Sequence, residues 1–129
     1  MSLPRSIDVV DAGSISVPIT GTETVVAVGP RLQTPKDTSV VLIQACVYLT
    51  GISGAGAATI SLRQGTTTAG PLVQPQYQFS TVAGEGSLTL TAMWTQSVSQ
   101  TDYVQYSLTV NGSGATFTCS RAVLHCISF

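Results

Sequence analysis

The sequence predicts an all-β protein, folded as a single-domain antiparallel β-sandwich of the jelly-roll type with seven to nine strands. Apolar residues alternate with polar ones in short segments, and no segment has the spacing of an amphipathic helix. Glycine, proline, asparagine and threonine separate these segments at intervals of roughly 8 to 14 residues. A chain of 129 residues is long enough for one domain with one hydrophobic core.

The N-terminal part of the chain has the weakest pattern. We expect residues 1–14 to form a flexible arm and residues 15–129 to form the β-sandwich domain. The segment Ile15–Ile19 alternates, but Pro18 lacks a backbone N–H and therefore confines this segment to a sheet edge or to the arm. The next predicted strand is Thr24–Val28, which a Gly-Pro pair ends.

The run from Val40 to Leu49 is apolar on both faces if it is extended. It is rich in β-branched residues, which favour a strand, and it is too short to cross a bilayer as a helix. A strand of a small β-protein normally buries one face and leaves the other in water. We therefore expect one face to build the core and a second subunit to cover the other. The predicted core face carries Val41, Ile43, Ala45, Val47 and Leu49. The predicted subunit interface carries Val40, Leu42, Gln44, Cys46 and Tyr48.

The remainder of the chain continues the alternation. Further strands are predicted over Ala58–Arg63, Leu72–Val73, Gln76–Phe79, Leu88–Trp94, Val104–Val110 and Ala115–Phe129. Pro75 separates two of these short strands, and a long Thr/Gly/Pro loop spans Gly65–Pro71. The segments Gly54–Gly56 and Asn111–Gly114 are predicted hairpin turns, because glycine and asparagine adopt the backbone angles of tight turns.

The charge content limits the partners. Charged residues make up 9% of the chain, against about 25% in an average soluble domain. The five Lys and Arg residues are scattered, whereas nucleic-acid binding needs clustered basic residues, so no nucleic-acid partner is expected. We expect no signal peptide and no membrane partner, because no apolar leader and no run of ~20 apolar residues occurs.

The three cysteines and the only histidine do not form a predicted metal site or disulfide. Cys119 and Cys126 are seven residues apart in one predicted strand, so they would lie about 23 Å apart on opposite faces. His125 and Cys126 are adjacent and would also point to opposite faces. We therefore expect three reduced cysteines in a protein made in a reducing cytoplasm, and no bound metal.

No catalytic residue is predicted. The six carboxylates lie mostly in turns without a partner, and no serine stands in the strand-turn-helix of a nucleophile elbow. The glycine-rich segment Gly54–Thr59 precedes a strand, whereas a dinucleotide loop precedes a helix, so no cofactor is expected. The protein is therefore predicted not to be an enzyme.

Five segments carry a resemblance to a known family: Thr38–Ile43, Val47–Thr50, Ile60–Gly70, Val104–Val110 and Ser120–Leu124. Together they resemble small tumour-necrosis-factor-like jelly-roll proteins of tailed bacteriophages. The resemblance covers roughly residues 15–129 and rests on hydrophobic patterns and the loop that follows Arg63. It implies a homotrimer that packs strand faces around a threefold axis and attaches to the virion surface.

The sequence and this resemblance lead to one functional prediction and one alternative. The first is a trimeric capsid decoration, or cement, protein that binds the major capsid protein or another virion protein and stabilises the phage head. Its N-terminal arm, with Arg5, Asp8 and Asp11, is expected to dock on the capsid. The alternative is a receptor- or glycan-binding head domain of a phage fibre. Tyr77 and Phe79 are the predicted surface-contact residues.

Overall fold

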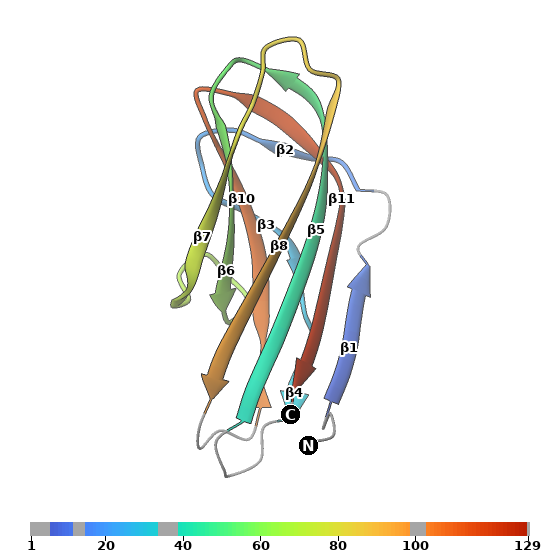
Figure 1. Cartoon of the computed structure of the whole chain (residues 1–129), viewed down its shortest axis with the longest axis vertical. Helices are drawn as coiled ribbons and strands as arrows, with labels where there is room; N and C mark the ends of the chain where they lie inside the picture. Colours follow the sequence, from blue (N-terminus) through green and yellow to red (C-terminus); the bar gives the residue numbers. More distant parts are fainter. Residues whose placement is uncertain (1–5, 12–14, 34–38, 99–102, 129) are drawn as a thin grey trace.

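The computed structural model describes residues 6–11, 15–33, 39–98 and 103–128. These residues form two antiparallel sheets that pack face to face, with a third sheet of two short strands (Figure 1). Sheet A contains β1 (Ser6–Asp11), β2 (Val17–Ile19), β5 (Ser39–Ser53), β8 (Ser87–Val98) and β11 (Thr116–Ser128). Sheet B contains β3 (Thr24–Val28), β6 (Ala57–Gln64), β7 (Leu72–Ser80) and β10 (Tyr106–Ser113). The third sheet pairs β4 (Leu32–Gln33) with β9 (Tyr103–Val104). No helix in the described ranges is long and apolar enough to cross a membrane.

The order of the strands is that of a jelly roll. Sheet A runs β1-β11-β5-β8, with β2 paired to the other end of β11, and sheet B runs β3-β10-β6-β7. From β2 onward, consecutive strands of the two large sheets lie in opposite sheets except for the β6–β7 pair, so the chain winds around the sandwich. The nine strands of three or more residues agree with the predicted number, and the β-sandwich fold is confirmed.

The hydrophobic core lies between the two sheets. The predicted core face of β5 is confirmed, because Val41, Ile43, Val47 and Leu49 are 0% exposed and Ala45 is 5% exposed. Trp94 and Tyr106 are the largest fully buried side chains. Their polar ends are satisfied, since Trp94 Nε1 donates to the Pro75 carbonyl oxygen at 2.7 Å and the Tyr106 hydroxyl donates to Gln96.

The two predicted hairpin turns instead connect different sheets. The turn after β5 leads into sheet B, and the turn after β10 leads into sheet A. The two turns pack against each other: a Cβ atom added at Gly56 would lie 2.0 Å from the Ser113 carbonyl oxygen, and one at Gly54 would lie 2.5 Å from that of Gly114. Glycine is needed at both positions because the two backbones approach so closely. In the sequence alone, these glycines cannot be distinguished from those of a hairpin turn.

A bulge in β11 changes the predicted positions of the cysteines. The register of β11 against β5 shifts between Cys119 and Arg121. Because a bulge adds one residue to the alternation, Cys119 and Cys126 both point into the core rather than to opposite faces, and they are 0% and 2% exposed. All three cysteines are free thiols, and burial raises the pKa of Cys119 to about 11.

Strand β7 runs through Pro75, where the sequence predicted two separate strands. Its register against β6 shifts between Ile60 and Leu62, which pair with Tyr77 and Val73. The ladder therefore skips the segment around Pro75 without ending the strand, as an edge strand allows.

Part of the segment expected to be a flexible arm is a strand. Ser6–Asp11 forms β1, in which Val9 pairs with His125 of β11. The alternation over these six residues is too short to separate a strand from a loop in the sequence alone, and the pairing partner is more than 100 residues away. Residues 1–5 and 12–14 lie outside the described part of the chain.

Candidate interaction surface

The outward row of β5 is where the sequence predicted a subunit interface. Val40 and Tyr48 are 45% and 39% exposed, and Gln44 is also exposed. Leu42 and Cys46 are half-buried. All five alternate with the buried core residues of β5, so they point away from the core. Because β5 lies between β11 and β8, this row runs along the interior of sheet A rather than along its edge (Figure 1).

The less polar cross-strand neighbours widen this row into a surface that we call the outer patch, which the outward threonines of β8 and Arg121 of β11 border. It consists of Val40, Leu42, Gln44, Cys46, Tyr48, Met93, Val123, His125 and Ile127. Gln44 lies between His125 of β11 and Met93 of β8, and Met93 is 50% exposed. No acidic residue occupies the outward positions of β5, β8 and β11 within the described residues. A contiguous apolar surface of this kind is typical of an interaction site.

The middle of the outer patch is hollowed into a shallow depression of about 640 Å³. Its lining includes Gln44, Cys46, Met93, Val123 and His125. The Gln44 amide donates to Met93 Sδ at 3.6 Å, which lays the Gln44 side chain across the surface toward β8. The sequence pattern identified the β5 residues of this surface, whereas the β8 and β11 residues depended on the strand order, which the pattern does not contain.

Tyr77 and Phe79, the predicted surface-contact residues, are half-buried and pack against the core. The Tyr77 ring meets Trp94 edge-on at a centroid distance of 5.4 Å, and its hydroxyl donates to the Met93 carbonyl oxygen at 2.5 Å. Tyr77 thereby joins sheet B to the edge of sheet A and forms part of the rim of the depression. Tyr77 therefore makes most of its contacts with other residues of the same chain.

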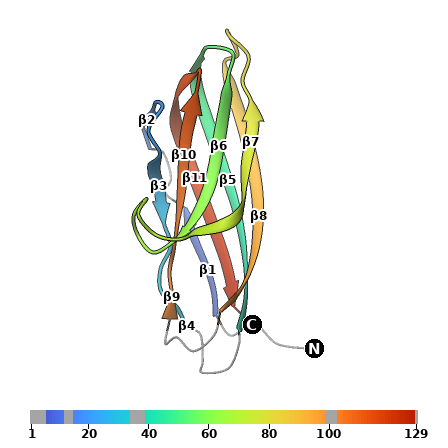
Figure 2. The same cartoon turned by 90° about the vertical axis from the view of Figure 1, so that its left-hand side faces the viewer.

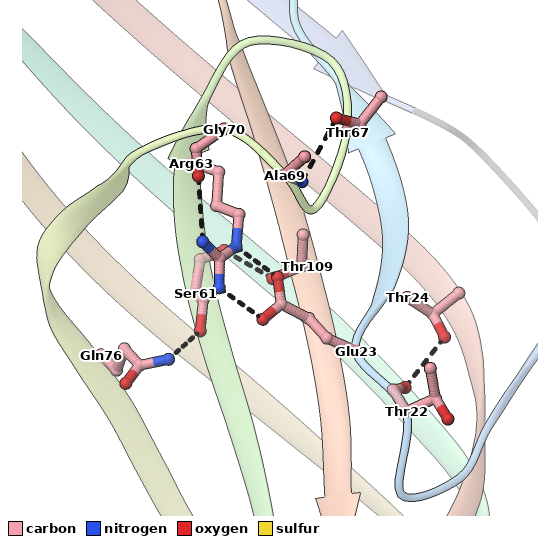
Figure 3. A network of polar contacts seen from close by, with 10 residues as sticks. All are labelled: Thr22, Glu23, Thr24, Ser61, Arg63, Thr67, Ala69, Gly70, Gln76 and Thr109. Carbon is pink, nitrogen blue, oxygen red and sulfur yellow. Dashed lines mark hydrogen bonds and ion pairs between the residues drawn. The ribbon is translucent and has the colours of Figure 1, made fainter.

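The loop 65–71, which the fibre-head alternative uses, is held against sheet B. The Arg63 guanidinium donates to both carboxylate oxygens of Glu23, at 2.5 and 2.9 Å, and to the Gly70 carbonyl oxygen at 2.9 Å (Figure 3). The hydrogen bonds from Arg63 hold the pKa of the Glu23 carboxyl below its usual value of 4.5. This pair joins residues that are 40 positions apart, so no local motif in the sequence indicated it.

A second depression, of about 590 Å³, lies beside this loop. Arg31 and Tyr103 stand at it, with the guanidinium carbon 4.4 Å from the centre of the Tyr103 ring. Gln64, Thr66 and Gln105 supply further polar groups. A cation stacked on an aromatic ring among amides and hydroxyls is a surface on which a polar ligand can bind.

Two of the predicted capsid-docking residues lie on an edge strand of sheet A. Asp8 and Asp11 are in β1, in register with Cys126 and Val123 of β11. Arg5 lies outside the described residues. The structure therefore places the two aspartates on the strand next to β11, which contributes three residues to the outer patch.

The described residues contain no group of three or more His, Cys, Asp or Glu side chains that could hold a metal ion. His125 lies on the outer patch. The Glu23 carboxylate is bound to Arg63. Cys119 and Cys126 are in the core and face away from His125. These side chains do not converge on a common point where a reaction could take place.

Comparisons with known proteins support the fold. No family model matches the sequence, and no curated protein matches it either. A chain of infectious bursal disease virus, Gx strain, has a TM-score of 0.54 at 12% identity over 98% of this chain and 33% of that chain. The disulfide-linked pilus of Bacillus endospore appendages has a TM-score of 0.43 at 20% identity over 98% of this chain and 90% of that chain. This chain therefore spans about a third of the length of the viral chain, and at such low identity the viral likeness shows a common β-sandwich fold.

Proposed function

We propose that this protein is a non-enzymatic structural component of a bacteriophage virion: a homotrimeric decoration protein that stabilises the head by binding the major capsid protein or another virion protein. The observation that carries this proposal is the outer patch. It is an exposed, mostly apolar surface in the middle of a sheet, and its described part carries no acidic residue.

The exposed apolar side chains of the outer patch would supply the free energy of association. Val40, Tyr48 and Met93 are between 39% and 50% exposed, and burying apolar surface contributes about 25 cal/mol per Å². Charged residues, which are depleted in the centres of interfaces, amount to 9% of the chain. A copy of the same surface is the simplest cover, because most oligomers are symmetric assemblies of identical chains.

The threefold symmetry and the virion partner come from the resemblance to tumour-necrosis-factor-like phage proteins. Gln44 is the polar residue of the outward β5 row, and its amide both donates and accepts, so three Gln44 side chains are able to bond to one another around an axis. The N-terminal segment with Arg5, Asp8 and Asp11 would then contact the capsid three times per trimer. Three weak contacts acting together give a stable attachment.

The test has two measurements. Analytical ultracentrifugation at micromolar concentration is expected to give three times the mass of the chain, and purified procapsids are expected to retain the protein through a sucrose gradient. A monomeric mass would refute the trimer. A trimer that passes through without binding the procapsids would refute the decoration role.

The fibre-head alternative is favoured by one observation, the depression that Arg31 and Tyr103 share with the loop 65–71. An aromatic ring and polar side chains of this kind suit a saccharide. Binding on a glycan array that Tyr103→Ala abolishes, together with no retention on procapsids, would establish the alternative in place of decoration.

A further inference from the structure

Strand β8 forms one edge of sheet A, and among the described residues β5 is the one strand that pairs with it in a backbone ladder (Figure 2). It is 12 residues long, whereas the other edge strands are β1, β2, β3 and β7, with 6, 3, 5 and 9 residues. An edge strand leaves a row of backbone N–H and C=O groups without a ladder partner, and another strand can add to that row.

The register shows which backbone groups of β8 are open. Gly51 N donates to the Gly86 carbonyl oxygen at 3.3 Å, just beyond the β5–β8 ladder. Bonded and non-bonded pairs alternate in an antiparallel ladder, so the Gln44–Met93 pair is non-bonded. The Met93 carbonyl oxygen accordingly accepts a bond from Tyr77, which comes from outside the sheet. The groups that point away from β5 therefore belong to Ser87, Thr89, Thr91, Met93, Thr95 and Ser97, and all of them except the Met93 carbonyl are open.

The other edges carry features that discourage strand addition. The sequence of β1 contains Asp8 and Asp11, β2 and β7 contain Pro18 and Pro75, and β3 is short. Charges, prolines and short length are the devices by which proteins protect sheet edges. The sequence of β8, Ser87–Val98, contains no charged residue, no proline and no glycine. Within the described part of the chain, the bond from Tyr77 to the Met93 carbonyl oxygen is the one contact that occupies this edge.

We propose that β8 is a second assembly surface, at which β8 of another copy of this chain pairs antiparallel across a twofold axis and continues sheet A from one subunit into the next. Identical strands without charge meet without repulsion. Apart from Met93, these open positions are threonine or serine, and hydrogen-bonding pairs of threonine with threonine or serine are favourable across strands. This contact uses backbone groups of the β8 edge, whereas the proposed trimer uses side chains of the outer patch, and Met93 belongs to both surfaces. Pairing through β8 would link neighbouring copies laterally.

Residue-resolved hydrogen exchange tests this pairing without any substitution. The amides of Thr91 and Thr95 point away from β5, whereas those of Ala92 and Trp94 are already bonded to it. On going from micromolar to near-millimolar protein, exchange at Thr91 and Thr95 is expected to slow by about tenfold or more, with little change at Ala92 and Trp94. Equal rates at Thr91 and Thr95 at both concentrations would overturn the proposal.

A matched pair of variants gives a second test. Thr95→Pro removes an N–H that faces away from β5, while Thr95→Val keeps it at the same outward position. Thr95→Pro is expected to abolish the concentration-dependent species larger than the proposed trimer, and Thr95→Val to retain it. Loss in both variants or in neither would overturn β8 pairing. If the natural protein forms dimers through β8 but no trimer, the proposed trimer is refuted while this inference stays in place.

Discussion

At the scale of single residues, Arg63 connects three separate parts of the chain. Its guanidinium binds Glu23, which precedes β3, and Gly70 in the loop that follows β6. The Arg63 and Glu23 side chains are 21% and 19% exposed, so solvent partly screens their attraction. Because two parallel hydrogen bonds join them, the pair is expected to stabilise the fold more than an ordinary surface ion pair does. We expect the contacts of Arg63 with Glu23 and Gly70 both to hold the loop 65–71 in place and to stabilise the fold.

The stability of the protein is expected to fall in acid through Glu23. The pKa of Glu23 is lowered in the folded state, so the unfolded chain binds the proton more tightly. The contribution of the pair is therefore present above pH 4.5, the usual value, and is lost as the pH falls through the lower folded pKa. Thermal melts from pH 7 to pH 3 should show a steeper loss in the natural protein than in Glu23→Gln, which should cost about 1 kcal/mol at pH 7. Parallel curves would show that the pair contributes nothing.

At the scale of elements, the sequence predicted the strands better than their connections. The core face of β5 was predictable because that face is wholly apolar, whereas Gln44 interrupts the opposite face. The sequence predicts hairpins at the turns that contain Gly56 and Gly114, because a glycine-rich turn has the same composition whether the next strand joins the same sheet or the opposite one. The bulge at β11 was invisible for a related reason: one inserted residue reverses the alternation without any distinctive residue type.

The contact between the two inter-sheet turns gives an element-scale prediction. A Cβ atom at Gly56 would lie 2.0 Å from the Ser113 carbonyl oxygen, which is backbone and cannot rotate away. Gly56→Ala is therefore expected to lower the free energy of unfolding by about 1–3 kcal/mol, as measured by urea denaturation. Gly21→Ala is the control, since no atom lies within 4 Å of its added Cβ, and it should change stability little. Similar losses in both variants would mean that the turn contact is not tight.

At the scale of the whole molecule, the two outer faces of the sandwich differ in kind. On sheet B, Ser61 and Thr109 are fully buried and belong to a polar network with Gln76, Glu23 and Arg63 (Figure 3). The side chains of this network bond within the chain, although the buried Ser107 hydroxyl of β10 has no hydrogen-bond partner among the described residues. On sheet A, exposed apolar residues surround Gln44, and the sequence predicted this surface only along β5. This difference favours sheet A over sheet B as the location of the proposed subunit interface.

This difference leads to a prediction for Gln44. Gln44→Glu places one negative charge on each copy of the outer patch, and three such charges around an axis repel each other. The proposed trimer is expected to dissociate toward monomer at neutral pH and to re-form near pH 4, where glutamate becomes protonated. Gln78→Glu adds the same charge to an exposed position on sheet B and should leave the mass unchanged. Sedimentation velocity at both pH values measures this. An intact trimer in Gln44→Glu at neutral pH would place the threefold axis elsewhere, and dissociation in both variants would point to net charge rather than to the outer patch.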